Sequence, residues 1–206
     1  MSSRMNRKIF TPALAAVSAL ILAPASANAG VLLPAATDCA DQTLSQPFIP
    51  WADTASYTLD AGGDFESTAD WQLKKGAAVV DGNEPFLVGS PTDSKSLSLP
   101  AGSGATSSAI CVGIEHPTIR FFARSGNPLA TLDVHAQFED VFGNVQSLQI
   151  GTVNGGGNWA PTATFPIIVN VLPLLPGQHT AVSFKFCATG GDFQIDDFYV
   201  DPYRSS

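Results

Sequence analysis

Two adjacent aspartates, Asp196 and Asp197, interrupt the otherwise apolar stretch Phe193–Val200 near the end of the chain. Successive side chains of an extended strand point to opposite faces, so one of the two carboxylates must point with the hydrophobic side chains. In a regular strand this residue is Asp197, which shares a face with Ile195 and Tyr199. A carboxylate turned inward needs a hydrogen-bonding partner, an opposite charge or a metal ion.

Calcium is the metal that suits such a site, because Ca²⁺ binds about six to eight oxygen atoms in a loose geometry. A second carboxylate, Glu66, ends the segment Gly62–Glu66, and with Asp197 and nearby backbone carbonyl groups it supplies an oxygen-only ligand set. The sequence therefore predicts a structural calcium ion held by Glu66 and Asp197. The alternative is that Asp197 accepts backbone hydrogen bonds or lies at a frayed strand edge, since no EF-hand-like loop accompanies it.

Aromatic side chains are a second source of binding chemistry, because an exposed ring stacks on a sugar while neighbouring polar groups bind its hydroxyls. The available rings are those of Trp51, Tyr57, Trp71, Trp159 and Tyr203. Trp159 follows a glycine-rich stretch and lies beside Asn158, so Trp159, Asn158 and Trp51 form our candidate ligand-binding set. Tryptophan in a β-sandwich is more often a core residue, and we place Trp71 in the core.

Catalysis finds little support in the sequence. The three histidines, His116, His135 and His179, lack the spacing of metal ligands, and the chain contains no G-x-S-x-G nucleophile motif. A paired-carboxylate hydrolase acting on glycans remains a third alternative, since eighteen acidic residues are present. We expect no enzymatic activity.

Two arginines, Arg120 and Arg124, flank Phe121 and Phe122 in a stretch of high β propensity. Opposite charges on neighbouring strands form side-chain pairs of this kind frequently. We therefore expect both arginines to form cross-strand ion pairs with acidic residues, in preference to an anion-binding site.

Short runs of β-branched and aromatic residues, separated by Gly, Pro, Asn and Asp, dominate the chain and predict an all-β fold. The expected strands are 56–59, 71–73, 77–80, 96–99, 118–124, 130–138, 145–150, 167–171, 181–187 and 192–200. This number of strands suits a two-sheet antiparallel β-sandwich of the jelly-roll type. We expect a hairpin around Asp140–Asn144 and a long loop over the glycine-rich stretch Thr152–Asn158.

The beginning of the chain has the features of a secretory leader: basic residues at Arg4, Arg7 and Lys8, an apolar stretch over 13–23, and the small-residue site Ala27–Ala29. We divide the chain into a signal peptide, 1–29, an N-terminal arm, 30–54, and a sandwich domain, 55–206. No later stretch has the roughly 20 apolar residues of a spanning helix, so we expect a secreted protein, with association to the cell surface as an alternative. The formal net charge of −8 disfavours nucleic acid as a partner.

Three cysteines would enter an oxidising compartment, where thiols tend to pair. A Cys39–Cys111 disulfide is the favoured arrangement, because it would tie the arm to a strand. Cys187 is then a free thiol, although pairing with Cys39 or with another molecule is also open.

A family resemblance rests on Gly62-Gly63-x-Phe65-Glu66, on Trp71 and on the closing segment Ile195–Val200. These resemble the first and last strands of galactose-binding-like jelly rolls, the architecture of many carbohydrate-binding modules. Such modules often hold a structural calcium ion between these strands, and the resemblance implies that Glu66 and Asp197 are the matching positions.

A second resemblance covers nearly the whole chain after residue 29. The chain is similar to secreted proteins of high-GC Gram-positive bacteria through the segments 51–53, 82–85, 96–100, 116–124, 159–162 and 196–202. That group carries no assigned activity, so this likeness implies export alone. We predict a non-catalytic module that binds polysaccharide or cell-wall glycan. The alternative is a structural or interaction protein of the cell envelope with no sugar ligand.

Overall fold

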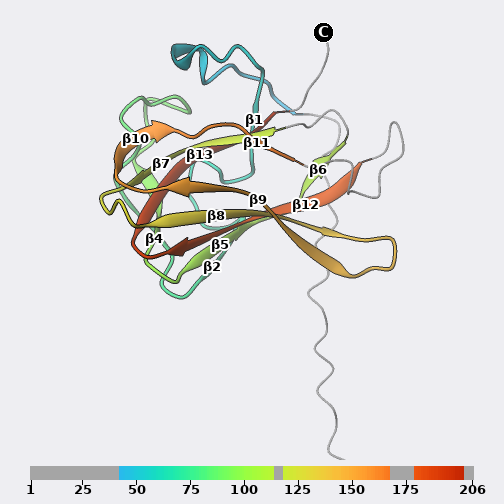
Figure 1. Ribbon diagram of the computed structural model, residues 1–206. Coiled ribbons are helices and arrows are strands. Elements are labelled where there is room, and N and C mark those ends of the chain that lie inside the picture. The colour runs from blue at the N-terminus through green and yellow to red at the C-terminus, as the bar shows by residue number, and fades with distance from the viewer. Residues whose placement is uncertain (1–41, 114–117, 168–178, 202–206) are drawn as a thin grey trace, which may run out of the picture.

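The computed structural model describes residues 42–113, 118–167 and 179–201, which form two antiparallel β-sheets packed face to face (Figure 1). We name each sheet after its central strand, as the β13 sheet and the β12 sheet. The predicted two-sheet sandwich is thereby confirmed. The predicted signal peptide, 1–29, lies outside the described residues, as do residues 30–41 of the predicted arm.

The β13 sheet contains seven strands. Its main order is β10 (Gly157–Pro161), β7 (Thr118–Ser125), β13 (Phe193–Asp201), β4 (Lys95–Leu99) and β3 (Ala78–Asp81), while β1 (Thr58–Leu59) pairs with β13 and β11 (Phe165–Pro166) with β7. Strand β4 pairs with Phe193–Ile195 of β13, and β1 pairs with Tyr199 and Val200. The segment of β13 between these two pairings is therefore open to side chains from loops.

The β12 sheet contains six strands. Its main order is β2 (Trp71–Lys74), β5 (Gly104–Ser107), β12 (Thr180–Thr189), β8 (Thr131–Glu139) and β9 (Val145–Asn154), while β6 (Ile110–Val112) pairs with β12. Strands β8 and β9 form the predicted hairpin, which extends beyond the rest of the sandwich (Figure 1).

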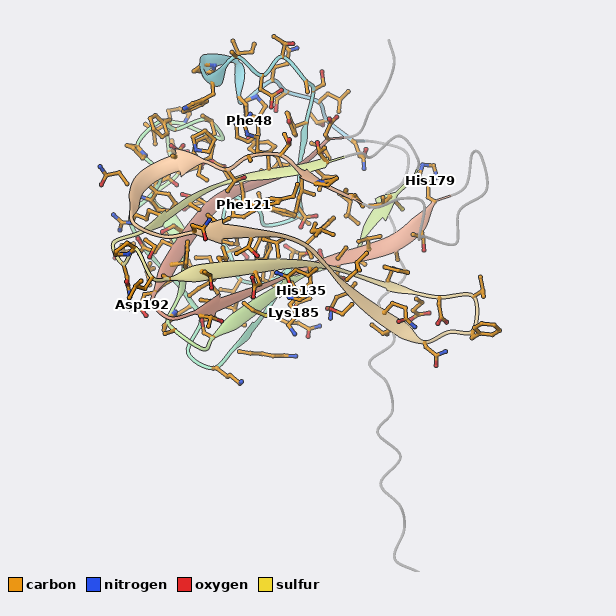
Figure 2. The ribbon with its side chains drawn as sticks, viewed as in Figure 1. Phe48, Phe121, His135, His179, Lys185 and Asp192 are labelled. Atoms are coloured by element: carbon orange, nitrogen blue, oxygen red, sulfur yellow. The ribbon has the colours of Figure 1, made fainter. Side chains whose placement is uncertain are left out.

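Alternating side chains build the core between the sheets. On β8 the predicted inward residues Leu132, Val134, Ala136 and Phe138 are all buried, while the residues between them are half-buried. The predicted core residue Trp71 is buried in the same cluster, and Phe121 lies between the two sheets (Figure 2). Period-two patterning therefore identified this part of the core correctly.

The glycine-rich stretch Thr152–Asn158 is not the long loop that we expected. Strand β9 continues to Asn154 and β10 begins at Gly157, so Gly155 and Gly156 alone join them. The N–H groups of these two glycines donate to the carbonyl groups of Ala130 and Ser125, at 2.8 and 2.9 Å. Gly156 has a φ of +94°, a conformation that favours glycine. The glycines thus permit a tight connection that leads into Trp159.

The segment before β1 covers the outer face of the β13 sheet. It contains a short 3₁₀ helix, Ile49–Trp51, and buries the ring of Phe48 against Tyr57, Phe122 and Tyr199. The same outer aromatic cluster includes Trp51 and Trp159, both half-buried. One face of the β13 sheet thus meets the core, and the other carries a second apolar layer.

Candidate functional site

A groove of about 750 Å³ lies on the outer face of the β13 sheet, at the end of the sandwich that Asp192 marks in Figure 2. The side chains that matter for binding come from four strands and one loop, and they are Phe86, Ser98, Arg124, Asn158, Trp159 and Gln194. The groove therefore combines aromatic rings with hydrogen-bonding groups. Such a combination is what a sugar-binding site requires.

Strand register explains the floor of the groove. Gln194 of β13 lies opposite Ser98 of β4 on one side and opposite Arg124 of β7 on the other. The side chains of these three residues thus form a polar row across neighbouring strands, facing away from the core. The Nε–H of Arg124 donates to the Oε1 atom of Gln194, which fixes both side chains.

Aromatic residues form the walls of the groove. Trp159 is half-buried on β10, and the guanidinium carbon of Arg124 lies 5.2 Å from the centre of its ring. Asn158 beside it is exposed, so the structure brings these two predicted residues together in the groove. Trp51 does not line the groove, but packs edge to face against Phe86, with ring centroids 4.8 Å apart.

Phe86 is the aromatic residue of this site that the sequence analysis missed, in addition to the polar row of Ser98, Gln194 and Arg124. It lies in the loop between β3 and β4, and its side chain is 45% exposed. No periodic pattern marks a single phenylalanine in a loop between prolines and glycines, so its position depends on tertiary contacts. The adjacent Glu84 supplies these, since its carboxylate accepts hydrogen bonds from the N–H groups of Phe86 and Val88.

The aspartate pair lies in the open segment of β13. The register against β7 shifts between Asp196 and Tyr199, and Asp197 adopts a left-handed conformation with a φ of +49°. This bulge resets the alternation, so the expectation that Ile195, Asp197 and Tyr199 share a face is wrong. Ile195 and Phe198 point into the core, whereas Tyr199 joins the outer aromatic cluster.

Both aspartates are buried, but they differ in their partners. Asp196 accepts hydrogen bonds from the N–H groups of Glu84 and Asp197, at 2.9 and 3.0 Å. Neither carboxylate oxygen of Asp197 has a partner at full hydrogen-bond geometry among the described residues, although its side chain is only 1% exposed. The Glu84 side chain and the Gly89 backbone lie close enough to act on its pKa as weak hydrogen-bonding neighbours. An orphaned buried carboxylate is costly unless it is protonated or meets a positive charge.

Further carboxylates surround Asp197. A Cβ atom built on Gly89 would fall 2.6 Å from Oδ1 of Asp197 and 2.8 Å from Oδ2 of Asp93, so the Gly89 backbone lies between the two side chains. Burial raises the pKa of Asp197 to about 8, and the negative charges of Glu84 and Asp93 act in the same direction. Burial likewise raises the pKa of Asp196 to about 8. The site thus concentrates negative charge, and no basic side chain of the described residues forms an ion pair with it.

Glu66 lies close to this cluster, but its oxygens have other partners. Its Oε1 atom accepts hydrogen bonds from the N–H groups of Ser94 and Lys95, at 2.6 and 2.8 Å, and Oε2 accepts one from the Ser94 hydroxyl at 3.2 Å. Burial alone would raise the pKa of Glu66, but these hydrogen bonds hold it below its usual value. Glu66 therefore fixes the residues that follow Asp93, and its role as a direct metal ligand stays a prediction.

In the part of the chain that the structure describes, no three His, Cys, Asp or Glu side chains are arranged to hold a metal ion by themselves. A cation beside Asp197 would therefore complete its coordination with backbone carbonyl oxygens and water, as calcium commonly does. The orphaned oxygens of Asp197 and the narrow space at Gly89 fit such an ion.

The outer face of the β12 sheet carries a second hollow, of about 400 Å³. The outward side chains that line it are polar, and they include Gln72, Lys74, Thr106, Gln137, Ser183 and Lys185. The one aromatic side chain in its lining is Trp71, which is 6% exposed and belongs to the core. This hollow can hydrogen-bond a sugar, but it offers no open ring on which a sugar could stack.

The described histidines do not form a common site. His135 lies on β8 opposite Lys185 of β12, and His179 lies well away from both (Figure 2). Burial and the charge of Lys185 lower the pKa of His135. His116 lies outside the described residues.

The cysteines are only partly described. Cys187 is a free, half-buried thiol on β12, and Cys111 is buried on β6. Cys39 lies outside the described residues, so the Cys39–Cys111 disulfide stays a prediction.

The two arginines of β7 have different partners. Arg120 forms an ion pair with Asp53, with 2.5 Å between Nη1 and Oδ2, and its Nε–H donates to the Thr162 carbonyl. Asp53 belongs to the covering segment, so this pair is not the cross-strand pair that we expected. Arg124 forms no ion pair with any described residue.

No family model matches the chain, and no curated protein matches its sequence. Among solved structures, the tandem CBM22-1–CBM22-2 domain of Paenibacillus barcinonensis Xyn10C aligns with 74% of this chain and 47% of its own length, at 14% identity and a TM-score of 0.52. The described residues also contain no helix long and apolar enough to cross a membrane.

Two further structures are similar. The CBM22-1 xylan-binding domain of P. barcinonensis Xyn10C aligns over 70% of this chain and 92% of its own, at 14% identity and a TM-score of 0.47. The CBM22-1–GH10 modules of Clostridium thermocellum Xyn10B, complexed with xylohexaose, align over 66% and 26%, at 12% identity and a TM-score of 0.49. This chain therefore spans about half of the tandem domain and a quarter of the xylanase. At 14% identity the likeness to the tandem domain establishes the fold alone, the jelly roll of a carbohydrate-binding module.

Proposed function

We propose that this protein is a non-catalytic module that binds a polysaccharide in the groove of the β13 sheet. The observation that carries the proposal is the pairing of the Trp159 and Phe86 rings with the polar row of Ser98, Gln194 and Arg124 in one open groove. Rings supply stacking surface and the row supplies hydrogen bonds to hydroxyl groups. The shared fold with a carbohydrate-binding module supports the same assignment.

An open groove on a sheet face suits a segment of a glycan chain. Its volume of about 750 Å³ is in the range of ordinary small-ligand sites, so a short run of sugar units fills it. The β12 sheet hollow is the competing location, and its lack of an open ring favours the Trp159 groove. Secretion, expected from the leader sequence, would place this groove among extracellular or cell-wall glycans.

We further propose that a calcium ion beside Asp197 supports the groove as a structural cofactor. The carboxylates of Asp197, Glu84 and half-buried Asp93 have no ion-pair partner among the described residues, and a divalent cation would compensate their charge. Glu84 also holds the backbone of Phe86, so the acidic cluster and one wall of the groove share a loop. The ion would stabilise that loop and take no part in chemistry. Glu66, the predicted second carboxylate, would support the same loop by holding the N–H groups of Ser94 and Lys95 at the start of β4.

The glycan proposal can be tested with a glycan array followed by pull-down on the polysaccharides that bind. We expect saturable binding by the natural protein and a loss of at least tenfold in affinity in Trp159→Ala. Truncation of an aromatic anchor residue to alanine typically costs about 2 kcal/mol or more of binding free energy. The matched control is Phe142→Ala, an exposed aromatic residue of the β8–β9 hairpin, 84% exposed and remote from the groove. Absence of binding to every glycan would favour the alternative of a cell-envelope structural protein.

A further inference from the structure

Arg124 is the one basic residue that lines the Trp159 groove, and its charge is not compensated by the described part of the protein. Its side chain is exposed, its Nε–H donates to Gln194, and no described carboxylate lies within ion-pair distance. Arg120, four residues earlier on the same strand, is by contrast neutralised by Asp53. A guanidinium has five N–H donors, so four of those on Arg124 remain available at the groove.

The ring of Trp159 orients these donors. The guanidinium carbon lies 5.2 Å from the ring centre, within the range of a cation–π contact, and the hydrogen bond from Nε–H to Gln194 fixes one edge of the group. A guanidinium held in this way presents a planar fork of two N–H groups, which matches the two oxygens of a carboxylate. Sugar hydroxyl groups match this fork less well, because they offer single acceptor atoms.

Desolvation gives the second argument. A glycan that lies across the groove excludes water from Arg124, and a charge that loses its water without gaining an opposite charge weakens binding. The nearest acidic residue of the groove lining is Asp192, whose Oδ1 atom already accepts a hydrogen bond from the N–H of Ala101 at 2.8 Å. The ligand must therefore bring the counter-charge itself.

We propose that the groove selects an acidic polysaccharide, in which the carboxylate of a uronic acid forms a bidentate pair with Arg124 while an adjacent sugar lies against the aromatic walls. This inference rests on the proposed function, because it names the ligand class of the same groove. The net charge of −8 opposes the approach of a long polyanion. Selectivity should therefore be measured with short ligands that differ in the carboxylate alone.

The test compares oligogalacturonates with their methyl esters, which keep the same sugars and linkages but lose the charge. Calorimetric titration of the full chain should give an affinity at least ~10-fold higher for the acid, since a hydrogen bond to a charged group contributes about 1.5–3 kcal/mol. The same comparison between glucuronoxylan and unsubstituted xylan fragments extends it to a second backbone. Equal affinity for acid and ester in both pairs would overturn the inference and leave the proposed glycan binding intact.

Variants of Arg124 separate the role of its positive charge from that of the paired N–H donors of its guanidinium group. Arg124→Met should bind acid and ester equally, and Arg124→Lys should keep a reduced preference because the charge remains but the fork is lost. The matched control is Lys185→Met on the β12 sheet, which should keep the full preference. A preference that survives Arg124→Met, or disappears in Lys185→Met, would contradict the inference. Absence of any binding by the natural protein would instead overturn the proposed function and this inference with it.

Discussion

The rings of Trp51 and Phe86 meet edge to face, with centroids 4.8 Å apart, and both rings also pack against Phe122. Trp51 comes from the segment that precedes the sandwich, and Phe86 from the loop between β3 and β4. Two segments distant in the sequence thus support one wall of the groove. Trp51, which the sequence placed among the ligand-binding residues, lies behind that wall.

Trp51→Ala should therefore weaken glycan binding indirectly. Removal of the indole leaves Phe86 without its support, and we expect a moderate loss of affinity, about threefold to tenfold, with a melting temperature lower by several degrees. Titration calorimetry and thermal unfolding measure the two effects. A complete loss of binding with an unchanged melting temperature would show instead that Trp51 contacts the sugar directly.

Calcium should raise the melting temperature of the natural protein above its value in chelator, because a ligand of the folded state alone stabilises that state. Asp197→Asn should abolish this shift. In chelator above pH 8, where the Asp197 carboxyl group is charged, the same variant should be more stable than the natural protein, since it removes that buried charge. Asp81→Asn, at an exposed aspartate of β3, is the control that should retain the calcium shift.

Gly89→Ala tests the same site without removing a carboxylate. The added methyl group would fall 2.6 Å from Asp197 Oδ1 and 2.8 Å from Asp93 Oδ2, and so would fill the space for the ion. We expect loss of the calcium shift and of terbium luminescence, a direct readout of ion binding. Gly126→Ala, where an added Cβ would meet no atom within 4 Å, should keep both. A full calcium response in Gly89→Ala would contradict the site.

Asp60 should make the protein less stable as the pH rises. It is buried, its Oδ2 atom has no partner among the described residues, and burial raises its pKa to about 8. Between its ordinary value near 4 and about 8 the folded state holds the proton more tightly than the unfolded state, so the free energy of unfolding falls with rising pH.

Asp60→Asn should remove this dependence. At pH 8.5 in chelator we expect the variant to exceed the natural protein by roughly 2 kcal/mol or more, since one pKa unit corresponds to about 1.4 kcal/mol, with the difference shrinking towards pH 4. Urea unfolding at several pH values measures it. A constant difference across the whole range would indicate a packing effect and not the titration of Asp60.

The Arg120–Asp53 pair should be strongly coupled. The guanidinium also lies 4.5 Å from the Phe48 ring centre, and Asp53 accepts a hydrogen bond from the Tyr57 hydroxyl at 2.7 Å. Burial alone would raise the pKa of Asp53, but the hydrogen bonds from Tyr57, Ala55 and Arg120 keep it below its usual value.

Removal of either charge should cost about 2–4 kcal/mol, because the partner remains partly buried. The double variant Arg120→Met with Asp53→Asn should lose less than the sum of the two single losses. Chemical unfolding of the four proteins provides this double-mutant cycle. Strict additivity would contradict a direct interaction that contributes to stability.

Sequence patterns predicted elements whose residues carry a clear period or turn signal. Strand β8 and its hairpin to β9 follow directly from alternation and from Asp140–Asn144. Strands β5 and β6 were not predicted. Strand β5, Gly104–Ser107, consists of small residues typical of loops, and β6, Ile110–Val112, is only three residues long. Strand β10 was not predicted, because its first residue, Gly157, was assigned to a loop.

The site was predictable only in part. Trp159 and Asn158 were identified from residue type and neighbourhood, and Asp197 from its charge in an apolar strand. The polar row of Ser98, Gln194 and Arg124 depends on register between strands that are far apart in the sequence, which local pattern does not reveal. The bulge at Asp197 also changes which side chains share a face, and no turn residue announces it.

The most direct measurement of the central claim is the indole N–H spectrum of ¹⁵N-labelled protein during titration with a bound oligosaccharide. The signal of Trp159 should shift saturably, that of Trp51 should shift less, and that of buried Trp71 should stay in place. Saturable binding that leaves Trp159 unchanged and perturbs the outer face of the β12 sheet, at Gln72 and Lys185, would contradict the groove assigned here.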